Sequence, residues 1–256
     1  MDVITETALL GGSAFVAGVI NSIAGGGTLL TYPALLAAGI SPIHANATST
    51  VCLVQGSLAS FWGYRRSLKN DGRLLLALAL PSLIGSVAGA LILLRLSERT
   101  FAVLVPWLIL GATSLFLLAD RLQRRWKDSP EAPLTDRRVL LLSSVQLLVA
   151  VYGGFFGAGQ GILMLATLGL CGLRDIDRMN GLKSFTAAAI NSFAAVLFIF
   201  GRLVEWRPAL IMAAAAVAGG YVGARGAQRI GKDNARRAVI AIGFGAAAYS
   251  FWKAFF

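Results

Sequence analysis

Long apolar runs separated by short polar segments follow one another along almost the whole chain. They cover about residues 8–24, 28–39, 46–63, 74–94 and 101–118 in the first half, and 139–157, 161–173, 184–200, 208–224 and 238–252 in the second. Most of these runs approach the roughly 20 apolar residues that a helix needs to cross a bilayer. The pattern predicts an all-α polytopic membrane protein with about 8 full spans and two shorter helices.

The second run of each half is too short to span a bilayer, at roughly 12 residues. Each short run follows a glycine cluster, Gly25-Gly26-Gly27 in one half and Gly157-Ala158-Gly159-Gln160-Gly161 in the other. Glycine permits the left-handed turns that would interrupt a helix. We therefore predict a re-entrant or broken helix in each half.

The two halves also share residues at one offset. A shift of 134 residues pairs Gly25 with Gly159, Gly27 with Gly161, Asn46 with Asn180, Thr50 with Ser184, Gly85 and Gly89 with Gly219 and Gly223, and Arg95 with Arg229. Polar and glycine matches at a constant spacing indicate an internal repeat. We divide the chain into a first membrane repeat (1–118), a cytoplasmic linker (119–138) and a second membrane repeat (139–256), which together form one transport domain.

Lys and Arg residues between the runs orient the protein, because cytoplasmic loops carry the basic excess. The basic segments lie at 65–73, 119–138, 174–178 and 225–237. Alternation from these loops places the N- and C-termini outside. The first repeat then starts outside and the second inside, so the two repeats have inverted topology. Each glycine-linked pair of runs has to cross the membrane zero or two times.

Composition supports the membrane class, with 57% hydrophobic and 14% charged residues and a mean hydropathy of +0.72. The formal charge of +11 comes almost entirely from these short loops, so nucleic acid is not an expected partner. Cys52 and Cys171 lie within apolar runs and are expected to behave as small hydrophobic residues. Asp2 and Glu6 precede the first run without any Lys or Arg, the reverse of a cleaved signal peptide.

The glycine clusters suggest an anion site, because each exposes backbone N–H groups at the start of a helix. Close helix packing is the alternative, which we prefer for Gly85, Gly89, Gly219 and Gly223. Polar residues near the clusters could line the same anion site, but each also has a structural interpretation. Those that precede or open the next runs could be N-caps, and those inside runs could form hydrogen bonds between helices. Lys183 is the best candidate for a charged contact, although it could also extend to the membrane interface.

The candidate substrate-binding residues are Asn21, Gly25, Gly26, Gly27, Thr28, Asn46, Thr48, Ser49, Gly159, Gln160, Gly161, Asn180, Lys183, Ser184 and Asn191. All twelve Asp and Glu residues lie at the termini or between runs, which argues against a cation pathway or a buried carboxylate relay. His44 is the sole histidine, so we expect no metal site. We expect no cofactor and no catalytic residue.

These motifs resemble the TauE/SafE sulfite exporter family. The resemblance rests on residues 21–33 (NSIAGGGTLLTYP), 45–49 (ANATS), 154–159 (GFFGAG), 180–184 (NGLKS), Asn191 and 201–206 (GRLVEW). It extends from about residue 8 to 252, and Gln160 and Leu182 depart from the pattern of many relatives. It implies a bacterial-type inner-membrane permease for sulfite or organosulfur anions such as sulfoacetate.

The expected function is secondary transport of a small sulfur oxyanion by alternating access at a midplane site between the two glycine clusters. An anion channel of the same fold is the alternative. A membrane enzyme acting on a lipid phosphate is a further one, less favoured because no buried Glu, Asp or His is available in the runs. The expected partners are the small anion and the lipid bilayer, and a homodimer is left open.

Overall fold

The computed structural model describes residues 2–69, 71–127, 133, 135–226 and 232–255. The described chain is helical and contains no strand. Its α-helices are α1 (Val3–Ile23), α2 (Thr28–Ala37), α3 (Pro42–Tyr64), α4 (Gly72–Leu94), α5 (Glu98–Lys127), α6 (Asp136–Phe155), α7 (Gln160–Leu170), α8 (Ile176–Phe200), α9 (Trp206–Gly226) and α10 (Lys232–Phe255). A short 3-10 helix, η1 (Arg65–Leu68), follows α3.

Helix lengths confirm the predicted all-α polytopic fold. Six helices within the described residues are long and apolar enough to cross a membrane, namely α1, α4, α5, α6, α8 and α9. Helix α3 is also 23 residues long, but buried polar side chains lower its hydropathy. The predicted short helices are α2, with 10 residues, and α7, with 11. Residues 119–127, expected to begin the linker, continue α5 as helix.

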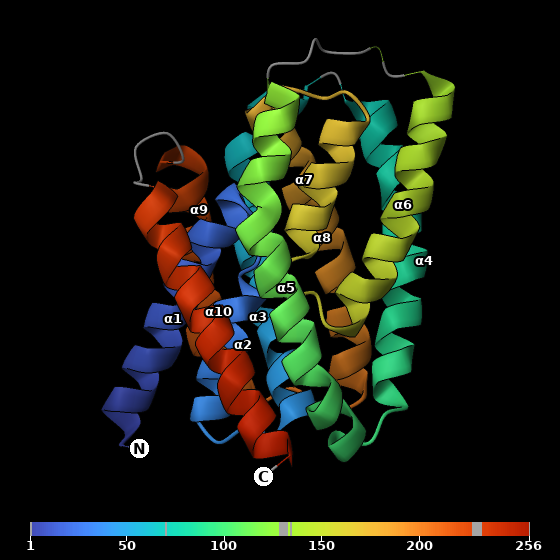
Figure 1. Cartoon of the computed structure of the whole chain (residues 1–256). Coiled ribbons are helices and arrows are strands. Elements are labelled where there is room, and N and C mark those ends of the chain that lie inside the picture. Colours follow the sequence, from blue (N-terminus) through green and yellow to red (C-terminus); the bar gives the residue numbers. More distant parts are fainter. Residues whose placement is uncertain (1, 70, 128–132, 134, 227–231, 256) are drawn as a thin grey trace.

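The helix packing has a twofold pattern: each extensive contact between two helices has an equivalent contact between their counterparts in the other half. Helix α1 packs along α9, and α6, its counterpart in the second half, packs along α4. Helices α3 and α8 pack against each other, as do α5 and α10. Figure 1 shows that α1 begins at the end where both termini lie, whereas α6 begins at the opposite end. The two halves therefore run in opposite directions through the bundle.

Each short helix returns its chain to the end from which that half started. At the end with the termini, Glu98 at the start of α5 accepts hydrogen bonds from Ser41 Oγ and the Ile43 backbone N–H, 2.9 and 3.1 Å away. At the opposite end, Arg178 near the start of α8 forms a salt bridge with Asp71, just before α4, at 2.6 Å. The glycine-linked pairs α1–α2 and α6–α7 are thus hairpins that enter from opposite ends.

Glycines on α4 and α9 let these helices approach their partners closely. A Cβ atom on Gly85 or Gly89 would collide with the backbone of α6, and one on Gly219 or Gly223 with the backbone of α1. This confirms the interpretation of these four residues as packing positions, since small residues permit close helix approach.

The repeat offset is not constant along the chain. Asn46 and Asn180 lie at equivalent places in α3 and α8, five residues after Ser41 and Asp175, the N-caps of the two helices. In the hairpins, however, α2 begins at Thr28 and α7 at Gln160, so Gly25 corresponds to Gly157 rather than to Gly159. The expected pairing of Gly25 with Gly159 is therefore wrong by two residues. Arg229, the expected counterpart of Arg95, lies outside the described residues.

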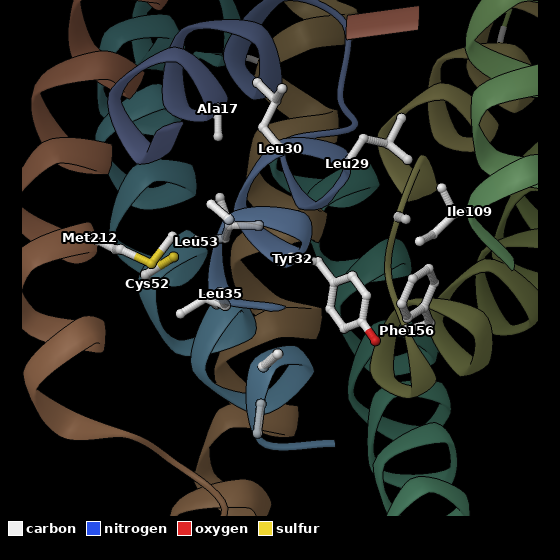
Figure 2. Packing of buried hydrophobic residues seen from close by; sticks show 14 of the residues in the cluster. Ala17, Leu29, Leu30, Tyr32, Leu35, Cys52, Leu53, Ile109, Phe156 and Met212 are labelled. Carbon is white, nitrogen blue, oxygen red and sulfur yellow. The ribbon is translucent and has the colours of Figure 1, made fainter. Parts of the chain in front are cut away.

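The largest buried apolar cluster joins the first hairpin to helices of both halves (Figure 2). Tyr32 of α2 packs edge-on against Phe156, which lies between α6 and α7, with ring centroids 5.5 Å apart. Cys52 and Cys171 are both buried and carry free thiols, as expected of small hydrophobic residues. This packing fixes the two hairpins relative to each other.

Candidate functional site

The two glycine turns meet inside the bundle. A Cβ atom on Gly25 would lie 2.6 Å from the Cα of Gly161, and one on Gly161 would lie 2.8 Å from the Cα of Gly25. Gly25 and Gly26 have φ angles of 81° and 102°, and Gly159 has 76°. Only glycine adopts such angles readily and leaves room for a second backbone at this distance. The structure thus brings together two clusters that are far apart in the sequence.

Both turns expose backbone donors at the start of a helix. Within the described residues, the N–H groups of Gly26, Gly27 and Thr28 donate no hydrogen bond, nor do those of Gly159 and Gly161. Gly27 and Gly159 are the N-cap residues of α2 and α7, and neither helix has a side-chain cap. Unpaired N–H groups at a helix start carry partial positive charge and can receive an oxyanion.

Helices α3 and α8 each reach across to the hairpin of the other half. The Lys183 ammonium on α8 donates to the Ser22 carbonyl, near the end of α1, over 2.8 Å. The Asn46 amide on α3 donates to the Phe155 carbonyl, at the end of α6, over 3.0 Å. The last carbonyls of a helix have no partner within it, so these contacts satisfy them. Each glycine turn is therefore held by a helix from the opposite half.

The polar residues near the starts of α3 and α8 are not N-caps, so that interpretation is wrong. Helix α3 begins at Pro42 after Ser41, so Asn46, Thr48 and Ser49 lie inside it. Helix α8 begins at Ile176, where Asp175 accepts hydrogen bonds from two backbone N–H groups as a true cap. The expected boundaries were late because the first turns of both helices are too polar to appear as part of an apolar run.

Lys183 is buried, and the expectation that it could extend to the membrane interface is wrong. The residue is 1% exposed. Its ammonium donates to Ser22 O and, at 3.0 Å, to Asn180 Oδ1, which uses two of its three donors. No carboxylate in the described part of the chain forms a salt bridge with it. A buried charge without a counterion is costly, which makes the position favourable for an anion.

A crevice too narrow to hold a water molecule adjoins Lys183 between α6, α7 and α8. Gln146, Gln160 and Thr186 contribute its polar groups. The Gln160 amide donates to Asn191 Oδ1 over 3.2 Å, and that of Gln146 to Ser82 Oγ over 2.8 Å. The side-chain oxygens of both glutamines are buried and have no hydrogen-bond partner in the part of the chain that the structure describes. The second half therefore places a cluster of buried polar groups beside the glycine turns.

The other candidate residues divide between the turns and contacts elsewhere. Asn21 donates to Ser57 Oγ over 3.2 Å, and Ser49 lies 2.6 Å from Thr31 Oγ1, so both join neighbouring helices. Thr48 accepts a hydrogen bond from the Glu205 backbone, before α9, and thus faces away from the turns. Ser184 is buried, and its hydroxyl has no hydrogen-bond partner among the described residues.

Gln146 is the clearest polar residue that the sequence interpretation missed. It is 1% exposed and lies in the crevice beside Lys183. The available signal was the same as for Gln160 and Asn191, namely an amide inside an apolar run. The acceptor carbonyls of Ser22 and Phe155 could not be found in this way, because every residue has a backbone carbonyl and residue type does not show which ones accept.

Comparisons with known proteins agree with the architecture. The family model described as sulfite exporter TauE/SafE matches residues 10–250. The probable membrane transporter protein YfcA of Escherichia coli K12 is 33% identical over 85% of this chain and 77% of its own. A probable membrane transporter protein of Haemophilus influenzae is 31% identical over 90% of this chain and 88% of its own. No solved structure matches.

Proposed function

We propose that this chain, which belongs to the TauE/SafE sulfite exporter family and is a multi-pass membrane transporter, moves small sulfur oxyanions across the inner membrane. The substrates in this proposal are sulfite or sulfonates such as sulfoacetate. The observation that most directly supports this proposal is the buried Lys183 ammonium, which has no carboxylate partner in the described residues and lies beside the glycine turns.

In this proposal the oxyanion binds between the two turns. Its oxygens accept hydrogen bonds from the free N–H groups that precede α2 and α7, and its charge is balanced by Lys183. Asn180 positions the ammonium through the 3.0 Å hydrogen bond. The tetrahedral or pyramidal shape of a sulfur oxyanion suits donors that converge from two directions.

We propose alternating access, which the inverted arrangement of the two halves supports. One hairpin enters from each end of the bundle, so small opposite movements would open the site to one side at a time. We place the end rich in Lys and Arg in the cytoplasm and both termini in the periplasm. The crevice beside Lys183 is narrow, which favours a carrier over a continuously open anion channel.

Flux measurements in proteoliposomes test this proposal. We expect labelled sulfite or sulfoacetate to enter vesicles that contain the protein and to be retained by vesicles without it. Lys183→Met should lower this flux by roughly tenfold or more at low substrate concentration, whereas Lys69→Met, a change at a basic loop residue, should leave it unchanged. Absence of flux for sulfite, sulfoacetate and other sulfonates would contradict the proposed substrates.

A structural role for Lys183 predicts a different result. If its ammonium only holds the end of α1, Lys183→Met should lower the thermal unfolding temperature, and sulfite should not stabilise the wild-type protein. If it binds the anion, sulfite should raise the unfolding temperature of the wild type and not that of the variant. The two measurements together separate substrate binding from folding.

A further inference from the structure

Helices α3 and α9, one from each half, run side by side in the same direction. The backbone N–H of Glu205, just before α9, donates to Thr48 Oγ1 near the start of α3 over 3.0 Å. At the other end of the pair, a Cβ atom added to Gly63 of α3 would lie 2.5 Å from the Cβ of Ala224 on α9. Both helices therefore end together, at the end of the bundle opposite the termini.

Helix α1 covers one side of this pair. On α3, Ser57 accepts a hydrogen bond from Asn21 of α1 over 3.2 Å. On α9, Gly219 and Gly223 face the backbone of α1 so closely that neither leaves room for a Cβ atom. Side chains that turn away from these positions lie on the opposite side of the pair, which α1 does not cover.

The uncovered side carries exposed apolar and aromatic residues on both helices. Leu58 and Trp62 of α3 are 46% and 59% exposed, and Val217 and Tyr221 of α9 are 42% and 36% exposed. Each pair is separated by four residues, so its members lie one above the other on the same face of their helix. We call these four residues the α3–α9 seam.

The seam ends in two arginines that stack on its aromatic rings. The guanidinium of Arg65 lies 4.2 Å from the centroid of the Trp62 ring, and its Nη1 donates to the Trp62 carbonyl over 2.7 Å. The guanidinium of Arg225 lies 4.5 Å from the centroid of the Tyr221 ring. Neither arginine forms a salt bridge within the described residues. Each ring thus fixes a positive charge beside exposed apolar surface.

This combination of charge and apolar surface fits a phospholipid. About 10 Å of helix separates Arg65 from Leu58, which is within the roughly 15 Å of hydrocarbon in one leaflet. The arginines then lie at the level of the headgroup, and the seam lies along the acyl chains. A second copy of the chain bound here with twofold symmetry would bring like-charged arginines together, which opposes that contact.

We propose that the α3–α9 seam is a binding site for an anionic phospholipid of the cytoplasmic leaflet. Arg65 and Arg225 donate hydrogen bonds to the headgroup phosphate, and the seam holds an acyl chain. The inference shares with the proposed function only the assignment of this end to the cytoplasm, where anionic lipids give the membrane surface a negative potential. Because α3 and α9 belong to different halves, a lipid bound here contacts both halves of the transporter.

Native mass spectrometry of the detergent-purified protein tests the charge preference without any transport. We expect phosphatidylglycerol to bind roughly tenfold more tightly than phosphatidylcholine, and the double change Arg65→Gln, Arg225→Gln to remove this difference. The matched change Lys69→Gln, Arg137→Gln removes two positive charges at the same end of the bundle, away from the seam, and should retain the preference. Equal losses in the two double variants, or no preference in the wild type, would overturn the proposal.

Fluorescence quenching by phosphatidylglycerol with brominated acyl chains tests the position of the lipid. At a low ratio of this lipid to protein, we expect Trp62→Phe to remove at least about half of the quenching seen in the wild type. Trp107→Phe, a change at an equally exposed tryptophan on α5, should leave the quenching largely unchanged. Similar losses in both variants would overturn the seam as the site.

Two further outcomes would assign the seam to a different occupant. If glycerol 3-phosphate raised the unfolding temperature as much as phosphatidylglycerol does, the site would bind a soluble phosphate and the lipid proposal would fail. If the purified protein were a dimer that Trp62→Ser separates into monomers, a second copy would occupy the seam. We expect neither result, since binding requires both the apolar strip and the arginines.

Discussion

Two of the contacts that cross between the halves hold a carbonyl at the end of a hairpin's first helix, but they start from non-equivalent positions of α3 and α8 and differ in chemistry. Asn46 of the first half holds the Phe155 carbonyl through a neutral amide, whereas Lys183 of the second half holds the Ser22 carbonyl through a charged ammonium. Ser49, the counterpart of Lys183 at the 134-residue offset, instead pairs with Thr31 within its own half. The backbone is repeated, but the positive charge is present once, which suits one anion at one central site.

The largest effect is expected from removal of that charge. Lys183→Met deletes a charged hydrogen-bond donor worth about 1.5–3 kcal/mol to an anion, so we expect flux at low substrate concentration to fall roughly 10- to 150-fold. Ser49→Ala, the corresponding change in the first half, should reduce flux at most about threefold. The two proteoliposome rates give the comparison, and equal losses would show that the halves contribute alike.

Substitutions in the two glycine turns should destabilise the protein to different extents. Gly25 and Gly157 have similar φ angles, 81° and 75°, but Gly25 faces the backbone of Gly161, whereas Gly157 faces the carbonyl of Gly153 at 3.0 Å from an added Cβ. Gly25→Ala should therefore lower the unfolding temperature more than Gly157→Ala. Thermal unfolding in detergent measures both. A larger loss for Gly157→Ala would contradict the observed contact between the two turns.

The two equivalent asparagines should affect different properties. Asn46→Ala removes the contact to Phe155 and leaves its carbonyl unpaired, so we expect about 1–3 kcal/mol of lost stability. Asn180→Ala leaves the Lys183 ammonium with one acceptor and should mainly change the apparent substrate affinity, by roughly tenfold. Unfolding temperature and the concentration dependence of flux separate the two outcomes. Identical behaviour would remove the distinction between a structural and a positioning asparagine.

The smallest effects on stability are expected for the charged pairs at the two ends of the bundle, Arg178–Asp71 and His44–Glu98. Arg178→Gln leaves Asp71, whose side chain is 6% exposed, without its charged partner and should lower the unfolding temperature by several degrees. His44→Gln disrupts a pair whose side chains are 33% and 44% exposed and should cost at most about 1 kcal/mol. Unfolding scans in low salt check this order. A larger effect of His44→Gln would show that the pair at the end with the termini contributes more to stability than the Arg178–Asp71 pair.

The pattern of apolar runs predicted the helices well because each span has to bury its backbone hydrogen bonds within itself. The short helices were predicted from length, and the glycine turns from residue type. Helix starts were less accurate, since the first turns of α3 and α8 contain polar residues that resemble caps. Gln146 was overlooked although its amide stands in an apolar run.

The sequence by itself determined the membrane class, the repeat, the two glycine turns and the family, because these depend on composition and on local residue order. Only the tertiary structure decided that Gly25 lies against Gly161, that Lys183 is buried, and that it donates to Ser22. The physical reason is that a lysine next to the start of an apolar run can be solvated at the interface or buried at the centre. Which of these it is depends on the helices that pack around it, and the residue order does not contain that information.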